Sequence, residues 1–353
     1  MTEHKTHLHH PDVHMPAAQW SEDQTLHVAA VYSNPFRWRT RRELANDFRR
    51  HMRHLPNVEL HLVELAYGDR PWDIADPSLY PTDVALRSRH ELFHKENLLN
   101  IGVQRFPSDW KYGAVIDADF HFSRHDIALE TIHQLQHYDF VQMFSSYTDL
   151  SGEHYGHGHR PIGTNNGAAY NYVMNGMPEG FGQGGWATGA GSDGEYGYGG
   201  GKVGATGGAW AFRRAAFDTV GGMMDRCILG HGDWFMFFGL IGEEAPDMHS
   251  SQYNPEYLAY IRAWQQRAAR LTKNIGYVDA HATHHYHGPK KRRAYSSRDK
   301  ILVKHQYSPV TDVHADWQGV LQLTPAKPRL RDDIRRYFIS RSEDVPHVPD
   351  ENT

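Results

Sequence analysis

Two aspartates after a short apolar run are residues whose type and spacing suggest chemistry. The stretch KYGAVIDADFHF, residues 111–122, carries Asp117 and Asp119 to the end of a predicted buried strand. Side chains two residues apart on a strand point to the same side, so the two carboxylates repel unless they bind a cation or hydroxyl groups. A divalent ion held by carboxylates and by the phosphates of a ligand is the usual solution. A solvated acidic pair is the alternative.

A group of four histidines lies in the stretch HATHHYHG, at His281, His284, His285 and His287. In an extended chain, the first, third and fourth of them share one face, and a turn near Thr283 would regroup them. Imidazole is a borderline ligand that suits Mn²⁺ or Zn²⁺. We expect one of these histidines to bind a metal, and the others to lie in the core or in solvent.

A single acid, Asp233, stands in the stretch GHGDW at the start of an apolar helix. The flanking glycines would let a ligand approach the backbone closely. Asp233 is either the N-cap of that helix, a role that aspartate fills well, or a general base within reach of an acceptor hydroxyl.

The elements that must position these residues alternate between strands and helices. Strands are predicted over 26–33, 58–68 and 139–147, and the strand before Asp117 belongs to the same series; helices are predicted over 41–55, 90–106 and 124–138. This alternation is typical of an α/β sheet with crossover helices, in which ligands bind outside the carboxyl ends of the strands.

The second half of the chain begins with a Gly-, Tyr-, Asn- and His-rich stretch over 148–208. A loop of this length inside a compact chain is typical of a lid or a binding loop, and its interleaved aromatic residues favour that interpretation over a plain linker. Regular patterns then return. They predict a strand and short helix over 206–222, a helix over 254–274, a strand over 274–288 and a helix over 329–341.

Composition sets broad limits on function. The 353 residues carry a formal net charge of −5, which argues against a protein that coats nucleic acid, although basic runs at 37–42 and 290–293 could contact phosphates. The single cysteine, Cys227, excludes an intramolecular disulfide and fits a reducing compartment. No apolar run is long enough to span a bilayer. We therefore expect a cytoplasmic protein without a membrane contact.

The order of the three motifs resembles the GT-A glycosyltransferase fold. The DAD strand, the stretch GGAWAFRR with GHGDW, and HHYHG are similar to the corresponding parts of the β-1,4-galactosyltransferases and polypeptide N-acetylgalactosaminyltransferases. The stretches NPFRWRTRRE, LFHKENLLNIG, FVQMFSSY and HHYHGPKKRRAYSSRDKIL also resemble glycosyltransferase-like proteins of large bacteriophages and giant viruses. The resemblance covers about residues 26–305, without the Gly-rich insert.

The resemblance implies a domain division and a cofactor. It implies a Rossmann-like, mostly parallel mixed sheet flanked by helices over 25–305, with 148–206 as a loop or lid. A His-rich leader over 1–24, expected to be disordered, precedes this catalytic domain, and a helical extension and tail over 306–353 follows it. It also implies Mn²⁺ or Mg²⁺ as cofactor and a nucleotide sugar, most simply a UDP-sugar, as donor.

The resemblance also implies roles for single residues. Asp119 would bind the ion, and Asp117 would bind the ion or the donor ribose. His287 is implied as a third ligand, with His284 and His285 as rivals. Asp233 would be the base of an inverting transfer, although the family pattern has two acids where this chain has one. Donor contacts are expected from Ser33, Asn34, Arg293, Tyr295 and Arg298, and less strongly from Lys95 and Asn97.

Several classes of molecule could supply the acceptor hydroxyl. A hydroxymethylated pyrimidine of phage DNA is placed slightly ahead of a glycan or a protein side chain, and a base in a duplex would have to be flipped. The residues are also compatible with two other classes of function. One is a carbohydrate-binding or virion protein without activity, and the other is a metal hydrolase or oxygenase that uses the histidines of HATHHYH.

Overall fold

The computed structural model describes residues 24–152, 159–176, 203–245, 252–271, 274–295 and 297–345. The predicted leader, apart from its last residue, and much of the predicted 148–206 lid lie outside these ranges.

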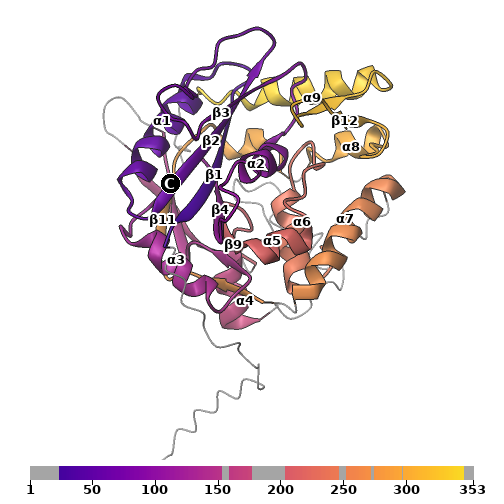
Figure 1. The fold of residues 1–353 in the computed structure, drawn as a ribbon. Coiled ribbons are helices and arrows are strands. Elements are labelled where there is room, and N and C mark those ends of the chain that lie inside the picture. Colours follow the sequence, from indigo (N-terminus) through magenta and orange to yellow (C-terminus); the bar gives the residue numbers. More distant parts are fainter. Residues whose placement is uncertain are drawn as a thin grey trace, which may run out of the picture.

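A mixed, mostly parallel sheet forms the centre of the molecule (Figure 1). In the described residues it has seven strands in the order β10-β6-β9-β4-β1-β2-β3, and β9 alone runs antiparallel to its neighbours. The strands are β1 (Leu26–Ser33), β2 (Val58–Tyr67), β3 (Val84–Ser88), β4 (Tyr112–Ile116), β6 (Phe140–Gln142), β9 (Ala209–Arg213) and β10 (Ile275–Tyr277). The predicted α/β fold class is confirmed.

Helices cover both faces of this sheet because both faces of its strands are apolar. One core joins the sheet to α1 (Arg39–His54) and α3 (Ile127–Leu135). The other joins it to α2 (Lys95–Val103), α5 (Arg214–Val220), α6 (Gly232–Ile241) and α7 (Pro255–Ala268). Figure 1 shows the strands between these two groups of helices. A parallel sheet covered on both faces is the usual arrangement for near-continuous apolar strands.

A second sheet lies next to the carboxyl end of β4. Its described strands are ordered β5-β11-β7-β8, namely β5 (Phe120–Phe122), β11 (His281–His284), β7 (Ser146–Leu150) and β8 (Pro161–Asn166). A short helix, α4 (Ala168–Asn175), follows β8. Part of the stretch predicted as a loop over 148–208 is therefore regular structure.

Two predicted strands are each divided between the two sheets. The 139–147 prediction corresponds to β6 in the main sheet and the start of β7 in the second sheet, and the 274–288 prediction corresponds to β10 and β11. Hydrophobic periodicity does not show such a change of sheet because the connecting residues Met143, Phe144 and Ser145 are buried as well. β3, in turn, follows a polar segment and was not predicted.

The C-terminal part packs into the core on the α2 side of the sheet. It contains α8 (Lys300–Lys304), the pair β12 (Val313–Ala315) and β13 (Leu321–Leu323), and α9 (Pro328–Arg341). Two short 3₁₀ helices, Ala269–Leu271 and Lys290–Arg293, complete the described elements. Leu321 and Ile334 belong to the same core cluster as Leu99 of α2. Among the described helices, none combines the length and apolar character that a bilayer span requires.

Candidate functional site

A large pocket opens where β1 and β4 end, at the edge of the sheet where a ligand site is expected. Its volume is about 980 Å³, within the range of small-molecule sites. Residues from both sheets, from α2, α6 and α9 and from the 290–293 turn line it. They include Ser33, Arg41, Lys95, Glu96, Asp117, Asp119, Asp149, Asp233, His284, His287, Arg293, Tyr295, Arg298 and Arg341.

Asp119, His284 and His287 converge in this pocket. His287 Nε2 lies 2.9 Å from Asp119 Oδ2, and His284 Nε2 lies 3.8 Å from Asp119 Oδ1. One donor atom from each of the three residues lies within 4.8 Å of the other two. The arrangement therefore offers two imidazoles and one carboxylate to a single point.

The second sheet brings these residues together. β5 and β11 are antiparallel, with His284 opposite Phe120, so Asp119 in the turn before β5 lies beside the end of β11. The backbone N–H of His285 donates to the Asp119 carbonyl at 2.9 Å, which fixes this turn. The chain after His284 is no longer a strand, and His287 therefore faces the same carboxylate as His284.

A buried acid orients one of the two imidazoles. Asp149 of β7 is 2 % exposed, and its Oδ1 lies 2.7 Å from His284 Nδ1. This contact turns His284 Nε2 toward Asp119. A carboxylate behind a histidine is the usual support of a metal-ligating imidazole, because it fixes the ring orientation and makes the ligand more basic. Asp149 lies at the start of the predicted loop, and no spacing signal pointed to it.

The chemistry of the three donors fits a divalent cation. Oδ1 of Asp119 is buried without a hydrogen-bond partner among the described residues. Burial works against ionisation of Asp119, but His287 and His284 hold its pKa well below the usual range. Burial, followed by the Arg293 charge, lowers the pKa of His287 to about 3, so its imidazole is neutral, as a ligand must be.

Asp117 does not face the same partners as Asp119, contrary to the expectation of two carboxylates on one side of a strand. β4 ends at Ile116, and Asp119 lies in the following turn. Asp117 pairs with Lys95 Nζ at 2.5 Å. Burial raises the pKa of Asp117 while Lys95 opposes that rise. Lys95, one of the weaker predictions, thus lies at the site as the cation paired with Asp117.

His285, a predicted rival ligand, lies in a different cluster. Its ring packs against His121 at 4.3 Å and against His159 at 5.5 Å between centroids. Burial, followed by the nearby His159, lowers the pKa of His285 to about 4. His281, at the other end of β11, contacts the hydroxyls of Ser146 and Thr148. Of the four histidines, the structure brings His284 and His287 to the pocket.

Asp233 lies in the first turn of α6 and lines the pocket. The N-cap position is held by His231, which has a positive φ of 70° and no side-chain cap hydrogen bond, so Asp233 is not the N-cap. A Cβ on Gly207 would approach Asp233 Oδ2 to 2.5 Å. A side chain at that position would therefore occupy the space of the carboxylate.

A second acid, Glu96 of α2, lies beside this turn and was not identified from the sequence. It is 3 % exposed, and a Cβ on Gly232 would meet its carboxyl carbon at 3.0 Å. Burial raises the pKa of Glu96 to about 8, with Lys95 opposing and Asp233 adding to the rise. Its position at the start of a helix is where acids commonly interact with the helix dipole, so it carried no distinctive signal.

The predicted basic residues form the pocket wall beside Asp119, His284 and His287. Arg293 Nη1 donates to the Tyr295 hydroxyl at 2.9 Å, and the Arg298 guanidinium lies over the Tyr295 ring at 5.0 Å. Burial opposes ionisation of Tyr295, but Arg293 lowers its pKa overall. Arg293 is 6 % exposed, and its Nε has no hydrogen-bond partner among the described residues. Such a group is suited to an anionic ligand.

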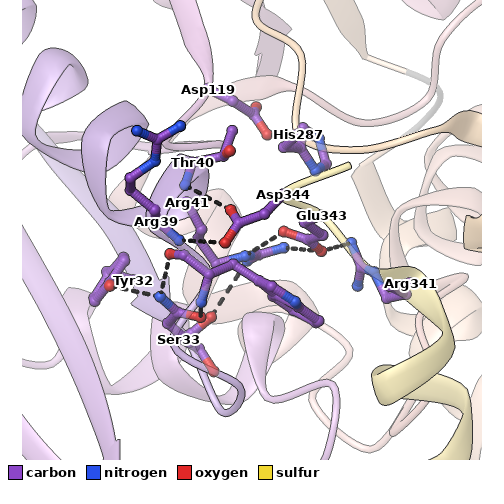
Figure 2. Close-up of polar contacts among 12 residues, drawn as sticks. Tyr32, Ser33, Arg39, Thr40, Arg41, Asp119, His287, Arg341, Glu343 and Asp344 are labelled. Atoms are coloured by element: carbon purple, nitrogen blue, oxygen red, sulfur yellow. Dashed lines mark hydrogen bonds and ion pairs between the residues drawn. The ribbon is translucent and has the colours of Figure 1, made fainter. Parts of the chain in front are cut away.

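Two further arginines line the pocket on either side of an acid from the C-terminal segment. Figure 2 shows Glu343 between Arg41 of α1 and Arg341 of α9, close to Asp119 and His287. Arg41 donates to both oxygens of Glu343, at 2.7 and 2.8 Å, and Arg341 Nη2 lies 2.8 Å from Oε1. Burial raises the pKa of Glu343, but the two arginines lower it to about 2. Arg41 belongs to the basic run at 37–42, whereas Arg341 and Glu343 were not identified from the sequence.

The remaining predicted residues divide between the pocket and the scaffold. Ser33 lines the pocket, and its hydroxyl lies 2.8 Å from that of Tyr67. Asn34 is buried. Its side-chain amide donates to the Trp38 carbonyl and accepts from the Trp38 N–H. Asn97 bonds the carbonyl of Gly319 and the N–H of Leu321. Asn34 and Asn97 thus hold loops in place.

Comparisons with known proteins identify no family. No family model matches the chain, and no curated protein matches it. Solved structures with some likeness include Drosophila β-1,4-galactosyltransferase 7, as a mutant with manganese, UDP-Gal and xylobiose (15 % identity, TM-score 0.33) and as a catalytic domain with xylobiose (16 %, 0.33). Each match covers 87 % of this chain and 97 % of the galactosyltransferase chain.

A third structure is from Desulfovibrio desulfuricans G20, provisionally assigned as a nucleotide-diphospho-sugar transferase. It has 10 % identity and a TM-score of 0.32, and the match covers 80 % of this chain and 98 % of the Desulfovibrio chain. Likenesses this small do not establish what the chain does, so its function has to be inferred from the site.

Proposed function

We propose that the protein is a metal-dependent glycosyltransferase that uses a nucleotide sugar, most simply a UDP-sugar. The observation that carries this proposal is the convergence of Asp119, His284 and His287 beside Arg293 in one large pocket. A nucleoside diphosphate needs a divalent ion and cationic groups, and arginine matches phosphate oxygens well. Arg293 and Arg298 would contact the diphosphate, with Tyr295 positioned between them.

The metal site would be formed by Asp119, His284 and His287, with Mn²⁺ or Mg²⁺ as the ion. A bound divalent ion supplies charge neutralisation to the diphosphate leaving group as a Lewis acid. Asp117, paired with Lys95, would contact the donor ribose, a role also open to Ser33 at the end of β1.

Asp233 is the proposed general base of an inverting transfer. Its carboxylate would take the proton from the acceptor hydroxyl while that oxygen bonds to the anomeric carbon and the bond to the nucleoside diphosphate breaks. Asp233→Asn should therefore bind the donor with unchanged affinity and lose turnover by about 10²-fold or more. Near-normal turnover in this variant would mean that Asp233 is not the base.

Transfer assays with a panel of hydroxyl-bearing substrates would identify the acceptor class. A hydroxymethylated pyrimidine in DNA is the first candidate, and glycans and protein hydroxyls are the others. The basic run at 290–293 is only partly available for a DNA backbone, because Arg293 is buried in the pocket and Lys291 lines it, whereas Arg292 is exposed.

Calorimetric titration of UDP and several UDP-sugars, with and without Mn²⁺, tests the donor site. The wild type should bind only with the ion, and Asp119→Ala should lose at least tenfold in affinity because the donor set loses its carboxylate. Asp218→Asn, which changes an exposed acid of α5, is the control and should behave as the wild type. Equal binding by Asp119→Ala and the wild type would contradict the proposal.

One observation favours a second candidate function. Two histidines and one carboxylate are also the donor set of non-haem iron oxygenases. Such an enzyme would consume dioxygen when loaded with Fe²⁺ and would bind no nucleotide sugar. The charged wall of Arg293 and Arg298, suited to a diphosphate, favours the transferase.

A further inference from the structure

A second group of potential metal ligands lies at the opposite end of the main sheet from the pocket. His27 is near the start of β1, and Glu59 and His61 are near the start of β2. Ser33, which lines the pocket, is the last residue of β1. Six residues of extended strand span about 20 Å, so this group is separate from Asp119, His284 and His287.

The register of the two strands brings the three side chains together. β1 and β2 are parallel, with His27 opposite Glu59 and Ala29 opposite His61. Positions 59 and 61 are two apart and therefore share a face of the sheet. His27 Nδ1 lies 3.0 Å from Glu59 Oε2, and one donor atom from each of the three residues lies within 4.8 Å of the others.

His61 has no protein partner for its polar atoms. It is 2 % exposed, and neither ring nitrogen has a hydrogen-bond partner among the described residues. His94 is equally buried, but its two nitrogens lie 3.1 Å from the Leu92 carbonyl and 2.9 Å from the Leu321 carbonyl. A buried polar group left without a partner costs about 1–3 kcal/mol. The contrast with His94 indicates that His61 is placed to bind something other than the protein.

The surroundings combine an apolar wall with access from solvent. Phe106 packs against both imidazoles, with ring centroids at 5.4 Å from His27 and 4.7 Å from His61. The Glu59 side chain is 39 % exposed, so the carboxylate side of the group reaches solvent. An ion could enter on the carboxylate side and be shielded by the aromatic ring on the other.

We propose that His27, Glu59 and His61 bind a zinc ion that joins β1 to β2. Two imidazoles and one carboxylate, with water as the fourth ligand, are the donor set of zinc sites that keep one open position. Zinc bonds of 2.0–2.1 Å place tetrahedral ligand atoms about 3.3 Å apart. The donor atoms would move closer on binding, and the Glu59 side chain, at 39 % exposed, has the most room to do so. No step of the proposed transfer uses this ion, and its binding to the folded chain would add to the free energy of unfolding.

Equilibrium dialysis with Zn²⁺ alone, followed by measurement of the zinc bound per chain, tests the proposal. The variant His61→Phe should bind one zinc ion fewer than the wild type, because it loses a ligand but keeps a ring beside Phe106. The variant His287→Ala should keep that ion, which separates this group from the pocket. Leader histidines are the same in every variant, so they cancel in the differences. His94→Phe is the control for loss of a buried imidazole and should keep the ion.

A milder substitution tests the same zinc site if His61→Phe does not fold. Glu59→Gln removes a ligand charge at a partly exposed position, and it should weaken zinc binding at least tenfold, the smallest effect expected even from an outer-shell partner. Zinc should also raise the melting temperature of the wild type but not that of His61→Phe. Identical zinc stoichiometry and affinity in the wild type and in the folded variants of Glu59 or His61 would overturn the proposal.

Discussion

At the scale of single residues, two acids have opposite tendencies: Glu96 lines the pocket, and Glu343 lies behind two arginines that line it. Glu343, between two arginines, stays ionised, whereas Glu96, buried beside Asp233, has its pKa raised to about 8. The difference follows from the number of cations in contact with each carboxylate. Glu343 has two arginines within hydrogen-bond distance, whereas Lys95 opposes the rise at Glu96 without cancelling it. Glu96 is therefore protonated in the folded protein near neutral pH.

This raised pKa predicts a pH dependence of stability. Because the folded state keeps a proton on Glu96 that the unfolded chain releases above pH 4.5, the free energy of unfolding should fall as pH rises from about 4.5 to 8. The slope from one such proton is at most about 1.4 kcal/mol per pH unit. Glu96→Gln should lack this contribution. Urea unfolding at several pH values measures it, with exposed Glu43→Gln as control; equal slopes in wild type and Glu96→Gln would contradict it.

At the scale of elements, the C-terminal segment completes a helix that begins about 300 residues earlier in the chain. The N-cap residue of α1, Trp38, makes no side-chain cap hydrogen bond. Instead, the Asp344 carboxylate accepts from the N–H groups of Arg39 and Thr40, at 2.9 and 2.8 Å (Figure 2). Carboxylates near a helix N-terminus also interact favourably with its dipole. The same segment places Glu343 against Arg41, so one short segment both caps α1 and contacts an arginine of the pocket wall.

Removing this cap should destabilise the protein. Asp344→Ala is expected to lower the free energy of unfolding by about 1 kcal/mol, the typical value of a helix cap. Asp344→Asn, which keeps one acceptor oxygen, should lose less. Denaturant unfolding monitored by circular dichroism measures both, and Asp332→Ala on the exposed side of α9 is the control. If Asp344→Ala is as stable as that control, the cap contributes nothing.

The elements also show what could be predicted from the sequence. β1 and α9 were predicted almost to the residue, because each carries a clear hydrophobic pattern of its own. The resemblance in motif order implied that Asp119 and His287 lie close together, and the structure places them 2.9 Å apart. The pair of Arg41 and Glu343 was not predicted, because its members are 302 residues apart in the chain. The division of one predicted strand into β6 and β7 was missed as well, because the buried connection continues the apolar pattern.

At the scale of the whole molecule, the proposed metal site joins two sheets. Asp119 follows β4 of the main sheet, whereas His284 ends β11 of the second sheet and His287 comes shortly after it. An ion bound to all three would hold the sheets together, and it would bind the folded chain far better than the unfolded one. Binding energy is therefore expected to appear as stability.

Mn²⁺ at one hundred times its dissociation constant should raise the free energy of unfolding by about 2.7 kcal/mol. The Asp119→Asn variant should lose most of this gain, because its amide oxygen is a weaker ligand. Asp149→Asn should need about 10–100 times more Mn²⁺ for the same gain, because the negatively charged carboxylate that supports the His284 imidazole is lost. Thermal unfolding at increasing Mn²⁺ measures all three curves, and His61→Phe, which changes the separate zinc group, is the matched control. A wild-type gain that Asp119→Asn keeps in full would place the ion elsewhere, and a gain that also disappears in His61→Phe would mean that Mn²⁺ acts through β1 and β2.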